Sequence, residues 1–164
     1  LQLMRVGQAM RIEVPSNMTP PRMIPFDTVW KIKLVNMKAP LPAPKFYMPK
    51  AEELSKTPSG LQYRVVKRAG KGPSPRAGQR VTVHYAGWLT DGKQFDSSYS
   101  RNQPATFDIG KVIPGWTEAL QLMKAGDTFL LVIPGKLAYG ARGAPGIPPD
   151  ATLVFHVELL KIGP

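Results

Sequence analysis

The sequence predicts an α+β fold: a curled antiparallel β-sheet wrapped around one short α-helix, with extra strands near the N-terminus. Segments in which apolar residues alternate recur from residue 60 onward, whereas only residues 114–123 show helical spacing. An Asp-Gly pair within residues 90–93 joins two of these segments directly, and only antiparallel neighbours accept so tight a turn. The helix is shorter than the roughly 12–15 residues that an isolated helix needs, so we expect it to pack on the sheet.

The first strands lie on either side of that turn. Residues 60–66 alternate weakly, and residues 79–89 alternate clearly. The turn at 90–93 suits a hairpin because glycine readily adopts the positive φ that such turns need. Residues 93–98 then form the return strand, and 106–110 form a short strand after a polar loop.

The helix has clear boundaries. Pro114 suits the first helical position, and Trp116, Leu120 and Met123 lie on one face at helical spacing. Gly126 follows, where a helix commonly ends. This face is the surface that we expect to meet the sheet.

The last third of the chain predicts two strands and a long loop. Residues 127–134 are apolar enough to be covered on both sides, and residues 151–162 alternate. Between them, residues 135–150 are rich in Gly and Pro and predict an ordered loop.

The beginning of the chain repeats part of its end. Residues 1–15, LQLMRVGQAMRIEVP, match residues 120–134, LQLMKAGDTFLLVIP, and residues 29–35 match 154–160 in the same order. A true internal repeat is the interpretation we adopt, and an unrelated pair of added strands is the alternative. Such a half-domain has exposed strand edges, so a dimer or strand exchange is one possible consequence.

These patterns divide the chain into three parts. Residues 1–38 are a partial, degenerate copy of a domain's C-terminal half, and residues 39–58 are a Pro-rich linker with one short helical turn. Residues 59–163 form the complete domain. Two alternatives stay open for the first copy: its front half lies upstream of Leu1, or its strands pair with another segment.

Composition excludes several classes of function. The chain has 164 residues, no cysteine and a net charge of +11, with Lys and Arg scattered along it. Thiol nucleophiles, disulfides and thiolate metal sites are therefore excluded, and both the bacterial periplasm and the cytoplasm remain open as compartments. No stretch approaches 18 uninterrupted apolar residues, so we expect no membrane span. We interpret the charge as a solvated surface rather than a nucleic-acid site.

Three ordered blocks carry a resemblance to a known family. They are VTVHYAGWLTDGKQFDSS, VIPGWTEAL and LAYGARGAPGIPPDATLVFHVELL. In these blocks residues 59–163 resemble the FKBP-type peptidyl-prolyl cis-trans isomerases, and residues 1–38 a degenerate part of the same domain. The resemblance implies the FKBP-like fold and an enzyme that isomerises X–Pro bonds and needs no cofactor or metal.

The resemblance also implies a site. Trp116 would form the floor under the proline ring, Asp96 would lie at the pocket edge, and the Tyr139 hydroxyl and the Ile113 N–H would be donors to substrate. Arg101 would orient the Asp and Tyr groups. The remaining wall and rim positions match Tyr85, Phe95, Val112, Ile147 and Phe155. Residues 1–38 lack the Tyr-Gly pair of the rim, so that copy is expected to be non-catalytic.

The expected partners are proline-containing peptides and unfolded protein clients, together with the macrolide inhibitors of the family. The alternative function is a chaperone module that binds proline segments or clients without turnover. Each site residue also has a structural alternative, because Tyr85 and Phe155 could be ordinary core residues and Trp116 could be plain helix packing.

Overall fold

The computed structural model describes residues 41–69 and 72–163. The predicted partial copy at 1–38, with its extra strands, and the first two residues of the linker lie outside the described residues.

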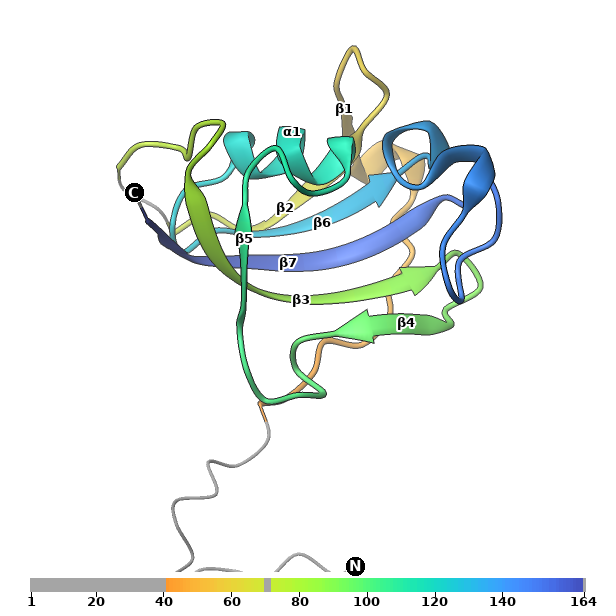
Figure 1. Ribbon diagram of the computed structural model, residues 1–164, viewed down its shortest axis with the longest axis horizontal. Coiled ribbons are helices and arrows are strands. Elements are labelled where there is room, and N and C mark those ends of the chain that lie inside the picture. The colour runs from red at the N-terminus through yellow and green to blue at the C-terminus, as the bar shows by residue number, and fades with distance from the viewer. Residues whose placement is uncertain (1–40, 70–71, 164) are drawn as a thin grey trace, which may run out of the picture. The chain divides into compact units, whose positions relative to one another are not determined.

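Within that range the chain forms one antiparallel sheet with a single α-helix on one face (Figure 1). The sheet has the order β1-β2-β6-β7-β3-β4, and β5 pairs with β3. The strands are β1 Ser55–Lys56, β2 Gln62–Lys67, β3 Arg80–Leu89, β4 Gln94–Ser97, β5 Ala105–Asp108, β6 Thr128–Ile133 and β7 Leu153–Ile162. The helices are α1 Pro114–Leu122 and three 3-10 turns, η1 Ala51–Glu53, η2 Gly135–Leu137 and η3 Gly140–Arg142. The predicted curled sheet around one short helix is confirmed.

The helix begins at the predicted residue, but it ends at Leu122 with Met123 as its C-cap, three residues before Gly126. Pro114 is the first helical residue, and the N–H of Met123 donates to the carbonyl of Leu120 at the C-terminal end. Gly115 lets α1 approach the sheet closely, since a Cβ there would lie 2.5 Å from Cγ2 of Ile133 on β6. The helix is thereby held against β6 by the absence of a side chain.

One hydrophobic core lies between α1 and the sheet. Trp116, Ala119, Leu120 and Met123 are buried there, and every residue of β6 is buried. Burying an aliphatic or aromatic side chain of this size contributes about 1.5–3 kcal/mol. The short helix therefore owes its stability to this face rather than to its own hydrogen bonds.

The outer face of the sheet carries a smaller cluster. Ala86, Trp88 and Tyr99 are buried in it, with Leu41 and Phe46 packed against them. The ring of Phe46 meets that of Trp88 edge-on at 6.0 Å between centroids. Residues before the predicted domain boundary at 59 thus contribute to packing.

The rest of that N-terminal segment is also attached. Pro49 is buried, η1 occurs where the short helical turn is predicted, and β1 pairs with β2. The Tyr47 hydroxyl donates to Glu53, whose carboxylate also lies 3.1 Å from the Arg64 guanidinium. In the described part, residues 41–58 lie along the sheet.

Candidate active site

Four aromatic rings from four elements meet around the start of α1. The indole of Trp116 stands nearly perpendicular to its three neighbours, with centroid distances of 5.2 Å to Tyr85, 5.4 Å to Phe107 and 5.3 Å to Phe155. Edge-to-face contacts of this kind contribute about 0.5–1.5 kcal/mol each beyond area burial. Trp116 is therefore held in one orientation from three sides.

A fifth ring extends this ring cluster, which we define as Tyr85, Phe95, Phe107, Trp116 and Phe155. Phe95 on β4 meets Phe155 on β7 edge-on at 5.5 Å between centroids. Both rings pack directly over Gly87 on β3, where a Cβ atom would lie 2.6 Å from the Phe155 ring and 2.7 Å from the Phe95 ring. The glycine at this point of β3 leaves the space that the two rings occupy.

A polar group of three side chains borders the ring cluster. The Tyr85 hydroxyl donates to Oδ2 of Asp96, and the Arg101 guanidinium donates to Oδ1 of Asp96 at 2.6 Å and to the Tyr85 hydroxyl at 3.0 Å. The backbone N–H of Ser97 donates to Asp96 as well, at 2.8 Å. One edge of the aromatic site therefore carries a fixed carboxylate and a fixed guanidinium.

These contacts set the protonation states of the polar edge. Burial and the hydrogen bond to Asp96 raise the pKa of the Tyr85 phenol to about 12. Burial alone would raise the pKa of Asp96, but the hydrogen bonds from Arg101 and Tyr85 outweigh it and hold that pKa below its ordinary value. At neutral pH the edge consists of a neutral phenol, a carboxylate and a guanidinium.

The predicted floor, wall and edge residues thus come together. Tyr85, Phe155 and Trp116 belong to the ring cluster, Phe95 extends it, and Asp96 and Arg101 form its polar border. Whether they act on a substrate remains a prediction.

Two more predicted wall residues lie directly before α1. Val112 and Ile113 precede α1 and pack against the core. The Ile113 carbonyl accepts the N–H groups of Trp116 and Thr117, whereas the Ile113 N–H has no hydrogen-bond partner among the described residues. A free N–H beside the ring cluster is consistent with the donor role predicted for Ile113.

The long loop contributes the last two predicted residues. Ile147 is buried, and its backbone pairs with Ala144. Tyr139 lies directly before η3 with 42% of its surface exposed, and its hydroxyl makes no hydrogen bond within the described residues. The structure places Tyr139 at the surface with its hydroxyl unengaged.

Phe107 is the ring that sequence reasoning missed. It lies on β5 opposite Val81 of β3, with its ring 5.9 Å from that of Tyr85 and 5.4 Å from that of Trp116. Alternation along the predicted strand at 106–110 could have placed it on the inner face, but the register with β3 was needed to place it against Tyr85.

One polar atom in the ring cluster is unusual. Trp116 Nε1 is buried and has no hydrogen-bond acceptor among the described residues. The rings of Tyr85, Phe107 and Phe155 lie nearly perpendicular to the indole, and an aromatic ring is at most a weak acceptor of an N–H group. The interior of the site therefore provides very little polar surface.

The two histidines lie on the other side of the sheet. His84 follows Val83 and precedes Tyr85 on β3, so its side chain points to the outer face, where its ring stacks on Tyr99 at 4.9 Å and bonds Ser98. His156 lies near Tyr99 on the same face. Among the described residues no group of three His, Asp or Glu side chains is arranged to bind a metal ion. In the same part of the chain, no helix has both the length and the apolar character that crossing a membrane demands.

Comparison with known proteins gives a consistent set of matches. Residues 72–160 match a family described as FKBP-type peptidyl-prolyl cis-trans isomerase. The chain is 56% identical over 113 residues to the FKBP-type peptidyl-prolyl cis-trans isomerase FkpA of Aeromonas hydrophila, a match covering 69% of this chain and 42% of the relative.

Two solved structures are similar. A crystal structure of FkpA from Escherichia coli has a TM-score of 0.67 and 51% identity, covering 70% of this chain and 54% of that one. A peptidyl-prolyl cis-trans isomerase from Pseudomonas syringae pv. tomato has a TM-score of 0.63 and 42% identity, covering 68% of this chain and 82% of that one. The matched part spans less than half the length of the curated FkpA relatives.

Proposed function

This chain belongs to the FKBP-type peptidyl-prolyl cis-trans isomerase family, and we propose that it accelerates cis-trans isomerisation of X–Pro bonds in peptides and unfolded proteins. The observation that carries the proposal is the perpendicular packing of Tyr85, Phe107 and Phe155 around Trp116, bordered by the Asp96–Arg101 pair.

The reaction makes modest demands of a protein. Rotation about a peptide bond faces a barrier of about 18–20 kcal/mol because amide resonance must be broken, and X–Pro bonds isomerise unaided in tens to hundreds of seconds. No covalent bond is made or broken, so no nucleophile or proton donor is required. An enzyme need only bind the twisted amide more tightly than the planar one.

An apolar site favours the twisted amide. The planar amide has more charge separation than the twisted one, so removing water costs the planar form more. The ring cluster offers such surroundings, since Trp116 is buried, its Nε1 has no acceptor among the described residues, and three aromatic rings pack against it. In this proposal the proline ring lies on the indole of Trp116.

The polar groups would orient the substrate. The Ile113 N–H and the Tyr139 hydroxyl, which have no partner among the described residues, are proposed as donors to substrate carbonyl oxygens. Asp96, fixed by Arg101 and Tyr85, is proposed to border the chain next to the proline. Val112, Ile147 and Phe95 complete the apolar wall. Macrolide inhibitors of the family would compete for the same surface.

A protease-coupled assay with a short X–Pro peptide tests this function. We expect the protein to accelerate isomerisation and Trp116→Leu to reduce kcat/KM by about tenfold or more. Trp88→Leu is the matched control, because Trp88 is also buried but packs on the outer face. Equal loss in both variants would contradict a specific role for Trp116.

The same assay separates the alternative, a module that binds proline segments without turnover. The intact ring cluster favours an enzyme over such a module. Peptide binding can be monitored by the quenching of Trp116 fluorescence. If the peptide binds but isomerises no faster than it does without the protein, the binding module is supported and the enzyme is refuted.

A further inference from the structure

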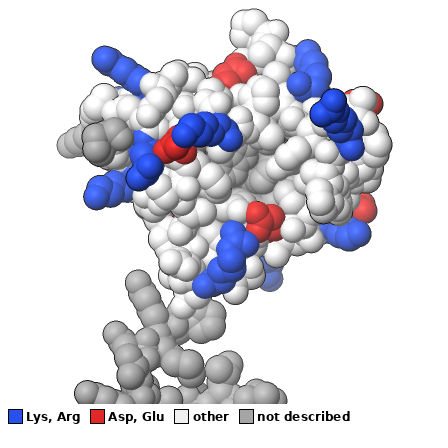
Figure 2. All heavy atoms as spheres, viewed as in Figure 1, with Lys and Arg blue, Asp and Glu red and all other residues white. Residues whose placement is uncertain are grey.

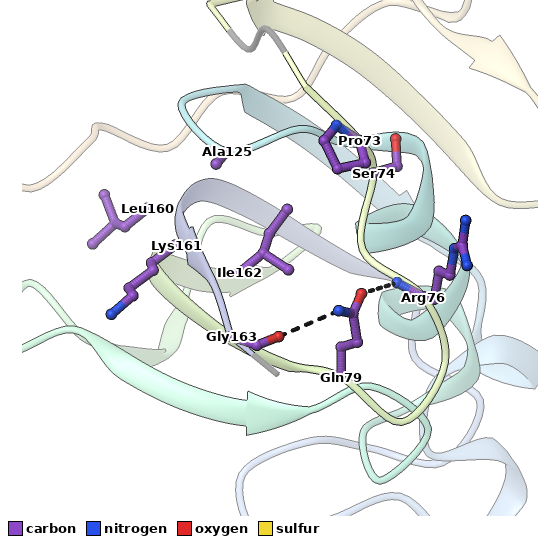
Figure 3. A pocket seen from close by; sticks show the side chains of 9 residues that line it. All are labelled: Pro73, Ser74, Arg76, Gln79, Ala125, Leu160, Lys161, Ile162 and Gly163. Atoms are coloured by element: carbon purple, nitrogen blue, oxygen red, sulfur yellow. Dashed lines mark hydrogen bonds between the residues drawn. The ribbon is translucent and has the colours of Figure 1, made fainter.

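A concave surface lies at the end of the sheet and shares no residue with the ring cluster. It is a groove of about 620 Å³ (Figure 3). One wall is the end of β7, residues 160–163, and the other is the segment 73–79 before β3, with Ala125 between them. Its volume falls in the range typical of ligand sites.

The β7 wall is an open strand edge. β6 begins at Thr128, which pairs with Glu158, so β7 continues for four residues beyond the end of β6. There its only strand partner among the described residues is β3, through Thr82↔Lys161 and Val81↔Ile162. On the other side of β7, the backbone of Leu159 still bonds Gly126 and Asp127 in the loop before β6, so the edge that no strand covers begins after Leu159.

The hydrogen-bond pattern shows which groups face the groove. The Gly163 N–H donates to the carbonyl of Arg80 at 2.7 Å, so Gly163 points its backbone toward β3. Because successive residues of a strand point their N–H and C=O groups to opposite sides, those of Ile162 point toward the groove. An open edge of this kind is a template for an added strand.

One side chain links the two walls of the groove. Gln79 accepts the Arg76 N–H at 2.8 Å and donates to the Gly163 carbonyl at 3.4 Å, as the dashed lines in Figure 3 show. The carbonyl of Gln79 also accepts the N–H of Ile109 at 2.9 Å. The segment 73–79 is thus fastened to the domain beside the open edge.

The surroundings of the groove are positively charged. Arg76 and Lys161 line it, are exposed, and form no ion pair with any described residue. Nearby, the carboxylate of Asp108 forms ion pairs with two cations, Arg80 and Lys111. Figure 2 shows several Lys and Arg side chains at the left of the view, the end where the C-terminus lies in Figure 1, and others at the right and lower edges. From residue 54 to residue 90 the sequence has seven Lys or Arg and no Asp or Glu.

We propose that this groove binds an extended acidic peptide segment, which adds as a strand to the free edge of β7 at Ile162. The main-chain groups of Ile162 supply the pairing, and Leu160, which is 38% exposed, gives an apolar contact. Arg76 and Lys161 select acidic side chains on the segment.

A peptide fits this surface better than a nucleic acid does. The walls contain Pro73, Ala125, Leu160 and Ile162, but no aromatic ring on which a base could stack. The two cations lie on either side of an apolar channel with backbone groups along one wall, an arrangement that suits alternating apolar and acidic side chains.

Fluorescence anisotropy with a labelled octapeptide that alternates Val and Glu and contains no proline tests the proposal. We expect saturable binding that weakens by about tenfold or more in Arg76→Glu/Lys161→Glu. Lys45→Glu/Lys93→Glu is the matched control, because it makes the same change in net charge at exposed lysines outside the groove. We expect less than about a twofold change in the control.

Two further peptides test the mode of binding. N-methylation of alternate residues removes the donors of one strand edge, so binding should be lost when the methylated edge faces β7. Replacing Glu by Lys should abolish binding. Binding that survives N-methylation of either edge, equal effects of the two double variants, or tighter binding of single-stranded DNA or anionic vesicles would overturn the proposal.

The test does not depend on isomerase activity, because the probe contains no proline. Isomerisation of a short X–Pro peptide should be unchanged in Arg76→Glu/Lys161→Glu, since neither side chain belongs to the ring cluster. A protein without isomerase activity could still bind the octapeptide, and an active isomerase could fail to bind it.

Discussion

The ring of Tyr85 stands perpendicular to that of Trp116, at an interplanar angle of 89° and 5.2 Å between centroids. The same tyrosine bonds Asp96 and Arg101 through its hydroxyl. Tyr85 therefore joins the apolar floor of the candidate site to its polar edge, and changes on either side are expected to reach the other.

Phe107→Leu tests the one ring of the cluster that was not predicted from the sequence. The substitution removes one of the three perpendicular neighbours of Trp116, so we expect the indole to move more freely and kcat/KM to fall by about three- to tenfold. The change should raise the mobility of Trp116 measured by time-resolved fluorescence. Phe46→Leu, which loosens the contact with Trp88 instead, should leave isomerisation unchanged.

Asp96→Asn tests the polar edge. The variant keeps the shape but removes the charge that Arg101 pairs with, and we expect a drop of about five- to tenfold in kcat/KM with little loss of stability, because both partners are partly exposed. Arg101→Leu should have a similar effect, and the double variant should cost less than the two changes combined. Independent, additive effects would show that the two side chains do not act as a unit.

The activity should be independent of pH from about pH 5 to pH 9. The pKa of Tyr85 is raised to about 12 and that of Asp96 lies below its ordinary value, so neither group changes its charge in this range. A profile of kcat/KM against pH measures this directly. A bell-shaped profile centred near neutrality would mean that a titrating group takes part in catalysis.

Gly87→Ala tests the close packing of Phe95 and Phe155. A methyl group at this position would lie within 2.7 Å of both rings, so the rings must shift, and we expect a loss of about 1–3 kcal/mol in the free energy of unfolding. Urea denaturation provides the measurement. Combining Gly87→Ala with Phe155→Leu makes room for the methyl group, so the combined loss should be smaller than the sum of the two.

His156 should make stability depend on pH. Burial lowers the pKa of His156 in the folded protein, although Glu158 acts in the opposite direction. The unfolded chain then binds a proton more readily than the folded one, so stability decreases as pH falls from about 6.5 through the lower, folded pKa. His156→Leu removes this contribution.

The free energy of unfolding, measured from about pH 7.5 to pH 5, should decrease more in the wild type than in His156→Leu. Identical slopes would show that His156 has the same pKa in both states.

Local chemistry in the sequence determined the secondary structure. Pro114 begins the helix, Asp91 and Gly92 form the hairpin turn, and the apolar run at 128–133 forms the fully buried strand, because each depends on neighbours along the chain. The resemblance of three sequence blocks to the FKBP family also predicted most residues of the candidate site.

Only the tertiary structure decided how those residues meet. The contact of Phe107 with Trp116 depends on pairing between β5 and β3, and the free edge at Ile162 exists because β6 begins at Thr128, opposite Glu158. Likewise, Phe46 packs on Trp88 although residues 39–58 are predicted to be a linker. Sequence patterns report the preferences of neighbours along the chain, whereas register and strand overhang depend on which distant segments pair.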